Sequence, residues 1–259
     1  MQAQSQQVGP GGPAHRSVAA GRGVNWWTEA WPWMFDGGRA GIWIGMGLVT
    51  MLIYVGLHFV PVLGPIAAHL LLFPLAGGLI LAARKSERGE TPEFADLFSG
   101  FGTHAGALLL AGVLIIAASL LVVGLMAMVG VGAAVSAFLG GLDLDLGSRP
   151  VAAAGLGIAT ALLLVVCLAL FIPISMAAWF APALIVLRGA QPVDALKSSL
   201  AACRANIGAL VVYGLLFIAF ALLASMLLGL GWLVLTPMAA LSTYGAYKDV
   251  LEPEVDIQL

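Results

Sequence analysis

Long apolar runs separated by short polar stretches dominate the chain. Each run has about the 20 residues that a helix needs to cross the hydrocarbon core of a bilayer, and none has Asp, Glu, Lys or Arg in its middle. A charge at that depth would cost about 3 kcal/mol on insertion scales. Six runs are predicted to be membrane-spanning helices: 40–59, 62–83, 105–129, 153–180, 207–228 and 231–248. The pattern therefore predicts an all-α integral membrane protein with six transmembrane helices.

Two of the runs are longer than a bilayer requires. The apolar run over 105–139 would extend about 52 Å as one helix, so Gly130 and Gly132 are predicted to break it. The run over 151–187 contains Pro173 and Pro182, which predict a kinked or tilted helix that reaches beyond the membrane surface.

The composition agrees with a membrane location and argues against other classes. Of 259 residues, 61% are hydrophobic and 9% are charged, whereas soluble domains carry about 25% charged residues. A soluble protein of this composition could not cover its own surface with polar groups, so the bilayer is the solvent that suits it. The formal net charge of -2 gives no indication of a nucleic-acid partner.

The basic residues lie almost entirely on one side of the predicted topology. Of the eleven Lys and Arg residues, only Arg149 falls in a connection on the other side, within 140–150. Cytoplasmic loops carry the excess of Lys and Arg in membrane proteins. We therefore expect a multi-pass protein of the bacterial inner membrane with both termini in the cytoplasm, as an even number of spans requires.

Three short amphipathic segments precede the first, third and fifth spans, and they suggest an internal repeat. They lie at 25–35, 91–101 and 191–204, and each is predicted to be an interfacial helix. A basic or titratable residue, an Ala and a Gly or Asn then lead into the span: Arg39-Ala40-Gly41, His104-Ala105-Gly106 and Arg204-Ala205-Asn206. Gly or Asn can adopt the unusual backbone angles that such a turn requires. The predicted helix-hairpin repeat units are 25–83, 91–187 and 191–250.

The second and third units align best, because "RGETPEFADL" from Arg88 and "RGAQPVDALK" from Arg188 match without gaps. In the first of these segments Phe94, Leu97, Phe98 and Phe101 are predicted to be buried, with Glu93 and Asp96 facing water. In the second, the predicted apolar stripe is Val193, Leu196, Leu200 and Cys203. Residues 1–20 are predicted to be a disordered tail, 21–250 the six-span membrane domain, and 251–259 a short acidic tail.

Five stretches of the chain carry a family resemblance. They are "AAGRGVNWWTEAW" (19–31), "VPVLGP" (60–65), "RKSERGETPEFADLFSGF" (84–101), "APALIVLRGAQPVDALKSSLAACRANIGAL" (181–210) and "STYGAYKDV" (242–250). The chain resembles the BPSS-type family of uncharacterised proteobacterial multi-pass inner-membrane proteins, from about residue 20 onward. The resemblance implies an all-helical inner-membrane protein and supplies no catalytic residues.

The candidate sites are few. We expect no catalytic, cofactor-binding or metal-binding residues, and we predict that Arg39, His104 and Arg204 contact anionic lipid headgroups at the three turns. His58 and His69 flank a proline-rich turn and could meet at a metal or haem, although two separate interfacial rings fit the pattern better. Five tryptophans between 26 and 43 could form a quinone or lipid pocket, although an aromatic belt at the membrane interface is the simpler interpretation.

Three functions remain open. The favoured one is a non-enzymatic scaffold or accessory subunit, lipid-associated and with a membrane-protein partner, because charge-free spans offer no proton relay or ion site. The second is a transporter, channel or lipid-handling protein for an apolar or zwitterionic substrate. The third is an enzyme that acts on a membrane-soluble substrate with cytoplasmic carboxylates and His104.

Overall fold

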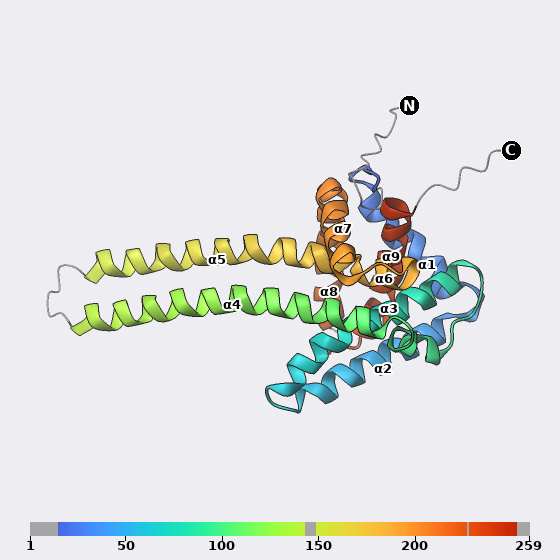
Figure 1. The fold of residues 1–259 in the computed structure, drawn as a ribbon, viewed down its shortest axis with the longest axis horizontal. Coiled ribbons are helices and arrows are strands. Elements are labelled where there is room, and N and C mark those ends of the chain that lie inside the picture. Colours follow the sequence, from blue (N-terminus) through green and yellow to red (C-terminus); the bar gives the residue numbers. More distant parts are fainter. Residues whose placement is uncertain (1–14, 143–148, 227, 253–259) are drawn as a thin grey trace. The chain divides into compact units, whose positions relative to one another are not determined.

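The computed structural model describes residues 15–142, 149–226 and 228–252, and the regular secondary structure of this part of the chain is helical (Figure 1). The absence of strands among these residues confirms the all-α fold class. The elements in chain order are α1 (Arg22–Phe35), η1 (Asp36–Gly38), α2 (Ala40–His58), α3 (Leu63–Glu87), η2 (Phe94–Phe101), α4 (Ala105–Leu142), α5 (Arg149–Trp179), α6 (Ala181–Arg188), α7 (Pro192–Ala205), α8 (Ile207–Met226) and α9 (Trp232–Leu251).

Five helical segments among the described residues are long and apolar enough to cross a membrane. They are Ala40–His58, Leu63–Glu87, Ala105–Met128, Ala161–Arg188 and Ile207–Met226. The integral membrane class is therefore confirmed. The sixth predicted span folds as α9, which is not among the five because hydroxyl, tyrosine and charged side chains lower its hydropathy. The count of six spans stays a prediction.

The chain divides into two compact units. One comprises Leu114–Ser175, which holds the C-terminal part of α4 and most of α5. Large apolar side chains are exposed along its described residues, with Leu121 77% and Met128 76% accessible. The other, here called the core unit, comprises the described residues 15–113 and 176–252, and all the sites discussed below lie within it.

Of the two predicted interruptions of long helices, the break at Gly130 and Gly132 was wrong. Helix α4 passes through Gly130 and Gly132 without a break and continues to Leu142. Glycine lowers helix stability by about 1 kcal/mol relative to alanine, which is too little to end a helix by itself. The run over 151–187 is interrupted at Phe180, close to the predicted kink: α5 ends at Trp179 and Pro182 opens α6, where its missing N–H has no partner to lose.

Helix α9 forms the centre of the core unit. It packs against α1, α2, α3 and α8, and Leu241, Ser242 and Ala246 are fully buried. The Tyr213 hydroxyl of α8 and Ser242 Oγ lie 2.9 Å apart inside this core. A helix surrounded by helices contacts protein instead of lipid, so small and hydroxyl side chains suit it. Its lower hydropathy is thus explained by its central position.

Glycines allow backbones to approach closely at several places in the core unit, including Gly47 and Gly100. A Cβ on Gly47 of α2 would lie 2.3 Å from the Leu233 carbonyl oxygen of α9, so α2 and α9 pack at a glycine. A Cβ on Gly100 of η2 would lie 2.0 Å from the Pro74 oxygen of α3. Gly41 and Gly45 form a GxxxG pair, but only Gly45 lies close to another segment. A Cβ on Gly45 would lie 2.6 Å from the Phe94 ring, whereas a Cβ on Gly41 would meet no atom of another segment within 4 Å.

The segment over 91–101 differs from the amphipathic α-helix that was predicted. It folds as the 3-10 helix η2, which begins after Glu93. A 3-10 helix repeats every three residues rather than every 3.6, so its buried positions are Asp96, Leu97 and Gly100. Phe98 is 46% exposed. The predictions of a buried phenylalanine stripe and of a water-facing Asp96 were therefore wrong.

Helix α7 forms where predicted but buries another face. Its buried residues are Pro192, Ala195, Ser199, Ala202 and Cys203, whereas Val193 is 46% exposed. Small side chains let this helix approach its neighbours closely, so they take the protein side and the larger apolar residues take the outer side. Of the predicted stripe, only Cys203 is fully buried.

The chain before α1 is ordered over its described part, in contrast to the predicted tail. Arg16 donates to the carbonyl oxygens of Lys248 and Glu252 at 3.1 and 2.7 Å, and the Val18 N–H donates to Asn206 Oδ1 at 2.7 Å. Residues 15–20 are therefore fixed to the ends of α7 and α9. Residues 1–14 and 253–259 of the predicted tails lie outside the described residues.

Candidate functional site

The three predicted turn residues have different surroundings. Arg39 is 8% exposed and donates to the carbonyl oxygens of Trp33 and Pro32 at 3.1 and 3.2 Å, so it caps the C-terminus of α1. His104 is half-buried at the start of α4, and Arg204 is exposed in the last turn of α7. The three residues are not equivalent, and the contact of each with anionic headgroups stays a prediction.

The left-handed backbone angles lie before these turns rather than within them. Gly37 and Gly38 have φ of 64° and 76°, directly before Arg39. Gly89 and Gly189, in the two aligned "RG" pairs, have φ of 80° and 65°, and both follow the end of a helix. Asn206 has φ of -124°. The expectation of unusual angles at Gly41, Gly106 and Asn206 was wrong, and the three-unit repeat stays a prediction.

A polar cluster surrounds the C-terminal end of α9, and its charged side chains pair with one another or bind hydroxyl and carbonyl groups. Glu87 at the end of α3 pairs with Lys248 and accepts a hydrogen bond of 2.6 Å from the Tyr244 hydroxyl. Arg188 at the end of α6 donates to the Tyr247 hydroxyl at 2.9 Å and to the carbonyl oxygen of Leu251. Cations at a helix C-terminus also interact favourably with its dipole.

Helix α1 joins this cluster through Asp249. The carboxylate of Asp249 accepts hydrogen bonds from Arg22 Nε at 2.6 Å and from the Trp26 indole at 2.9 Å. Arg22 also donates to both oxygens of Glu29 at 2.8 and 3.2 Å. Partial burial opposes the charge of Arg22, but its hydrogen bonds with Asp249 and Glu29 outweigh this and raise its pKa. The arrangement holds α1 against α9.

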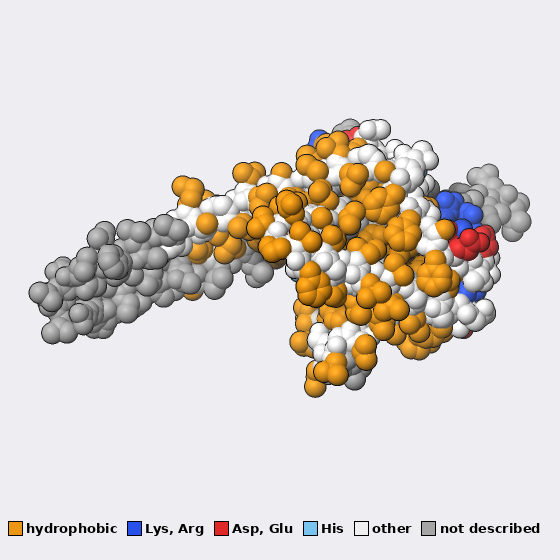
Figure 2. Space-filling view, turned by 90° about the horizontal axis from the view of Figure 1, so that it is seen from below, with side chains coloured by type: hydrophobic (Ala, Val, Ile, Leu, Met, Phe, Trp, Pro, Cys, Tyr) orange, Lys and Arg blue, Asp and Glu red, His pale blue; other side chains and the backbone are white. Residues whose placement is uncertain are grey.

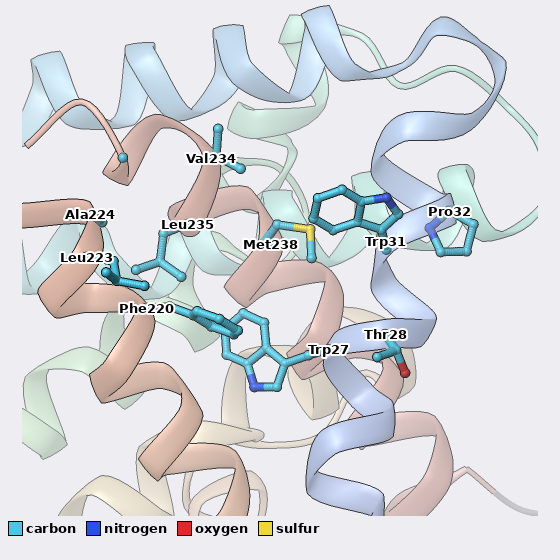
Figure 3. Close-up of a pocket in the computed structure, with 11 residues that line it drawn as sticks. Trp27, Thr28, Trp31, Pro32, Phe220, Leu223, Ala224, Val234, Leu235 and Met238 are labelled. Atoms are coloured by element: carbon cyan, nitrogen blue, oxygen red, sulfur yellow. The ribbon is translucent and has the colours of Figure 1, made fainter. Parts of the chain in front are cut away.

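An apolar cavity of about 590 Å³ lies on the other side of α1, where α8 and α9 cross (Figure 3). Its volume lies within the range of small-ligand sites, about 300–1,000 Å³. Ionisable side chains are missing from the residues that line it: Trp27, Thr28, Trp31, Pro32, Phe220, Leu223, Ala224, Gly231, Val234, Leu235 and Met238. The Thr28 hydroxyl donates to its own helix, to the Asn25 oxygen at 3.1 Å.

The tryptophans divide between the protein interior and this cavity. Trp26 and Trp43 are fully buried, and Trp43 donates to Ser86 Oγ at 3.0 Å. Trp27 stacks on Tyr213 with ring centroids 4.9 Å apart, whereas Trp31 is 56% exposed at the cavity. The belt interpretation is therefore wrong for the buried rings Trp26, Trp27 and Trp43. A cavity lined by Trp27 and Trp31, two of the five tryptophans, supports the alternative interpretation of a pocket.

The two histidines beside the outer turn bond to separate carbonyls. His58 Nδ1 lies 2.7 Å from the Tyr54 oxygen, and His69 Nδ1 lies 2.8 Å from the Pro65 oxygen. Both bonds stay within one helical turn, and both rings are exposed. Among the described residues, no three His, Cys, Asp or Glu side chains group as a metal site would require.

Sequence reasoning identified Trp27 and Trp31 but missed the residues of α8 and α9 that complete the cavity. Runs as uniformly apolar as 207–228 do not indicate which face meets another helix. The sequence held one indication, the small residues Ala224 and Gly231 on either side of the turn between α8 and α9. In the structure a Cβ on Gly231 would lie 2.4 Å from the Ala224 Cα. Small residues on either side of a turn indicate a close helix crossing, and the cavity lies beside this one.

The comparisons with known proteins place the chain among membrane proteins. A family profile described as "Domain of unknown function (DUF7847)" matches residues 98–256. A probable inner membrane protein of Burkholderia thailandensis is 30% identical over 240 residues, covering 81% of this chain and 87% of the relative. No solved structure matches. These findings confirm the predicted resemblance to uncharacterised proteobacterial membrane proteins.

Proposed function

Since the chain belongs to the family described as Domain of unknown function (DUF7847), we propose that it is a non-enzymatic accessory or scaffold protein of the bacterial inner membrane that associates with lipid. The proposal includes the predicted orientation, with both termini in the cytoplasm. A probable inner membrane protein among its relatives supports the location.

The observation that carries the proposal is the separation of charge from the cavity. Glu87, Asp96 and Asp249 each form an ion pair with a Lys or Arg, and these pairs join one helix to another. General acid–base chemistry needs an ionisable group within reach of a bound substrate. The cavity lining contains none, so the geometry favours binding over catalysis.

The distribution of side chains on the surface points in the same direction. Figure 2 shows hydrophobic side chains over much of the visible described surface, whereas Lys, Arg, Asp and Glu are confined to its right edge and its top. Exposed apolar residues on α8, such as Leu215 at 62% and Leu222 at 63%, suit contact with lipid or with another membrane helix.

Quantitative co-purification tests the proposal. The tagged full-length chain is extracted from native membranes with a mild detergent, beside an unrelated multi-pass protein at the same expression level. We expect one or a few membrane proteins in constant ratio to this chain, and no change in that ratio in a Glu93→Gln/His104→Gln variant. Absence of any enriched protein would contradict the scaffold role.

The cavity favours a second candidate, a lipid-handling protein for an apolar substrate. Reconstitution into vesicles with a headgroup-labelled phospholipid distinguishes the two functions. An accessory protein leaves the rate of lipid transfer between leaflets at that of protein-free vesicles, whereas a lipid-handling protein raises it.

A further inference from the structure

We propose that the cavity between α1, α8 and α9 holds one acyl chain of a membrane phospholipid, which enters sideways from the bilayer. This inference deepens the lipid association proposed above by assigning its site and ligand class. It applies equally to an accessory protein and to a lipid-handling protein.

The lining suits an apolar occupant. Among the residues that line the cavity, Thr28 is the one with a side-chain hydroxyl, and that hydroxyl already donates to Asn25. The other polar side-chain groups of the lining are the indole N–H groups of Trp27 and Trp31, whereas a water molecule needs two to four polar partners to remain in a cavity. A hydrocarbon chain needs no such partners and gains contact with aromatic and aliphatic side chains.

The mouth of the cavity opens onto a surface that faces hydrocarbon. Trp31, Phe220 and Leu223 line the cavity and are also 56%, 39% and 59% exposed, so they form its rim. Phe220 and Leu223 belong to α8, which is one of the five candidate spans. Part of the rim therefore belongs to a candidate membrane-spanning helix, and acyl chains are the abundant molecules beside such a helix.

The floor of the cavity is rigid enough to keep its shape. Trp27 is 5% exposed and lies between Tyr213, stacked at 4.9 Å, and Phe220, edge-on at 5.2 Å. Leu235 and Met238 of the central helix α9 are each 6% exposed. A side chain held on several sides does not collapse into the void, so a chain-sized space persists for a ligand.

Charged residues do not line the cavity, so recognition depends on the chain and not on the headgroup. Anionic and zwitterionic phospholipids with the same acyl chains should compete equally for this site. In that respect it differs from the predicted headgroup contacts of Arg39, His104 and Arg204.

The test uses the full-length protein in vesicles of phosphatidylcholine that contain a phosphatidylcholine with a diazirine on one acyl chain. After photolysis, mass spectrometry maps the labelled peptides. We expect labelling of the segments around Trp31, Leu223 and Val234 that unlabelled phosphatidylcholine and phosphatidylglycerol reduce to the same extent.

Two substitutions fill the cavity and one serves as a matched control. Val234→Trp fills it from inside, and Leu223→Trp fills it from the exposed rim, where the fold tolerates a larger side chain. Leu215→Trp adds the same indole to an exposed position of α8 outside the cavity. We expect each filling variant to lower labelling at least fivefold and the control to leave it unchanged.

Equal labelling of Leu223→Trp and wild type, or labelling that unlabelled lipid does not reduce, would overturn the acyl-chain site. A fall in oligomeric mass on Leu223→Trp without any lipid labelling would mean that a second copy of the chain fills the cavity, which also overturns it. Either result leaves the co-purification ratio untouched, so failure of this inference differs from failure of the proposed function.

Discussion

The segments that follow Arg88 and Arg188 start from the same pattern and reach different structures. In both, a helix ends at an Arg-Gly pair whose glycine has positive φ, and a proline follows three residues after that glycine. The first segment then folds as η2, a 3-10 helix of 8 residues, and the second as α7, an α-helix of 14 residues. The shared pattern therefore fixes how each segment begins but not how it continues.

The two segments also attach differently to the helices that precede them in the chain. Gly100 of η2 lies against the Pro74 backbone of α3, and Asp96 reaches Lys85 at 2.7 Å. The residue aligned with Gly100 is Leu200, which has no room for such an approach. Helix α7 instead attaches through Ser199, whose hydroxyl donates to Met176 O at 2.6 Å and accepts from the Phe180 N–H at 3.0 Å.

The largest loss of stability is expected when Gly100, the closest contact of η2, is replaced by leucine, the residue at the aligned position of α7. In Gly100→Leu the new Cβ alone would lie 2.0 Å from the Pro74 oxygen, so the substitution should destabilise the protein by about 3 kcal/mol. Denaturant unfolding in detergent measures this. Gly106→Ala is the control, because nothing lies within 4 Å of its Cβ position; equal losses would show that η2 is not packed as described.

A smaller loss is expected at the anchor of α7. Ser199 is fully buried, so Ser199→Ala leaves the Phe180 N–H and the Met176 carbonyl without this partner and should cost about 2 kcal/mol. The aligned Ser99 has no side-chain hydrogen bond to a described residue, and Ser99→Ala should be nearly neutral in the same unfolding measurement. A similar loss at both serines would argue that the two segments attach in the same way.

The ion pair of η2 should contribute less. Asp96→Asn removes the charge that faces Lys85, and because the Lys85 side chain is 40% exposed the loss should be about 1 kcal/mol and should shrink at high salt. Asp194→Asn, on the exposed first turn of α7, is the control and should be neutral. A loss at Asp96 that is independent of salt would attribute its role to the capping hydrogen bond with the Glu93 N–H alone.

The ends of the two segments differ in charge, and this affects lipid more than stability. The exposed Arg204 should contribute about 1 kcal/mol toward an anionic headgroup, so Arg204→Gln should lower phosphatidylglycerol retention about fivefold in native mass spectrometry. His104→Gln, at the aligned position, should change it less at pH 8. Unchanged retention in Arg204→Gln would leave that residue only a role in topology.

The last prediction compares the reactivity of two aligned positions, 103 and 203, rather than their contribution to stability. Burial raises the pKa of the Cys203 thiol to about 12, so at pH 8 it is protonated and cannot attack a maleimide as a thiolate. The aligned Thr103 is exposed. In a Cys167→Ala background we expect Cys203 to stay unlabelled in the folded protein. A Thr103→Cys/Cys203→Ala protein should be labelled rapidly; fast labelling of Cys203 would contradict its burial.

Hydrophobic patterning was sufficient for the helices but not for the faces that they bury. The positions of α2, α3 and α8 follow from the runs of apolar residues, because a run that long has one structure available in a bilayer. Which side of α7 meets the protein depends on the small residues Ala195 and Ala202, and periodicity based on large apolar residues gave a neighbouring face that shares only Cys203 with it. In η2 the period itself was three, so a template of 3.6 misplaced Asp96.

The candidate site was half predictable for a related reason. Trp27 and Trp31 are rare and large, so the sequence drew attention to them. Their partners on α8 and α9 are ordinary residues of apolar helices, and only tertiary contact distinguishes Leu223, which lines the cavity, from Leu215, which does not. The turn position of Arg39 did not indicate that its guanidinium caps the end of α1, because such a contact depends on the fold of the preceding helix.

The central position of α9 has a consequence for the order in which the chain matures. Ribosomes make α9 after every other helix, yet it supplies the partners of Arg16, Arg22, Glu87 and Arg188, which are made long before it. Contacts that join residues 232 and 236 positions apart cannot form before α9 has been synthesised. Until then, Glu87 and Arg188 lack the partners that α9 supplies, and the core unit lacks its central helix. The core unit therefore completes its fold only once α9 has emerged from the ribosome, and the helices made earlier have to persist without their central partner until then.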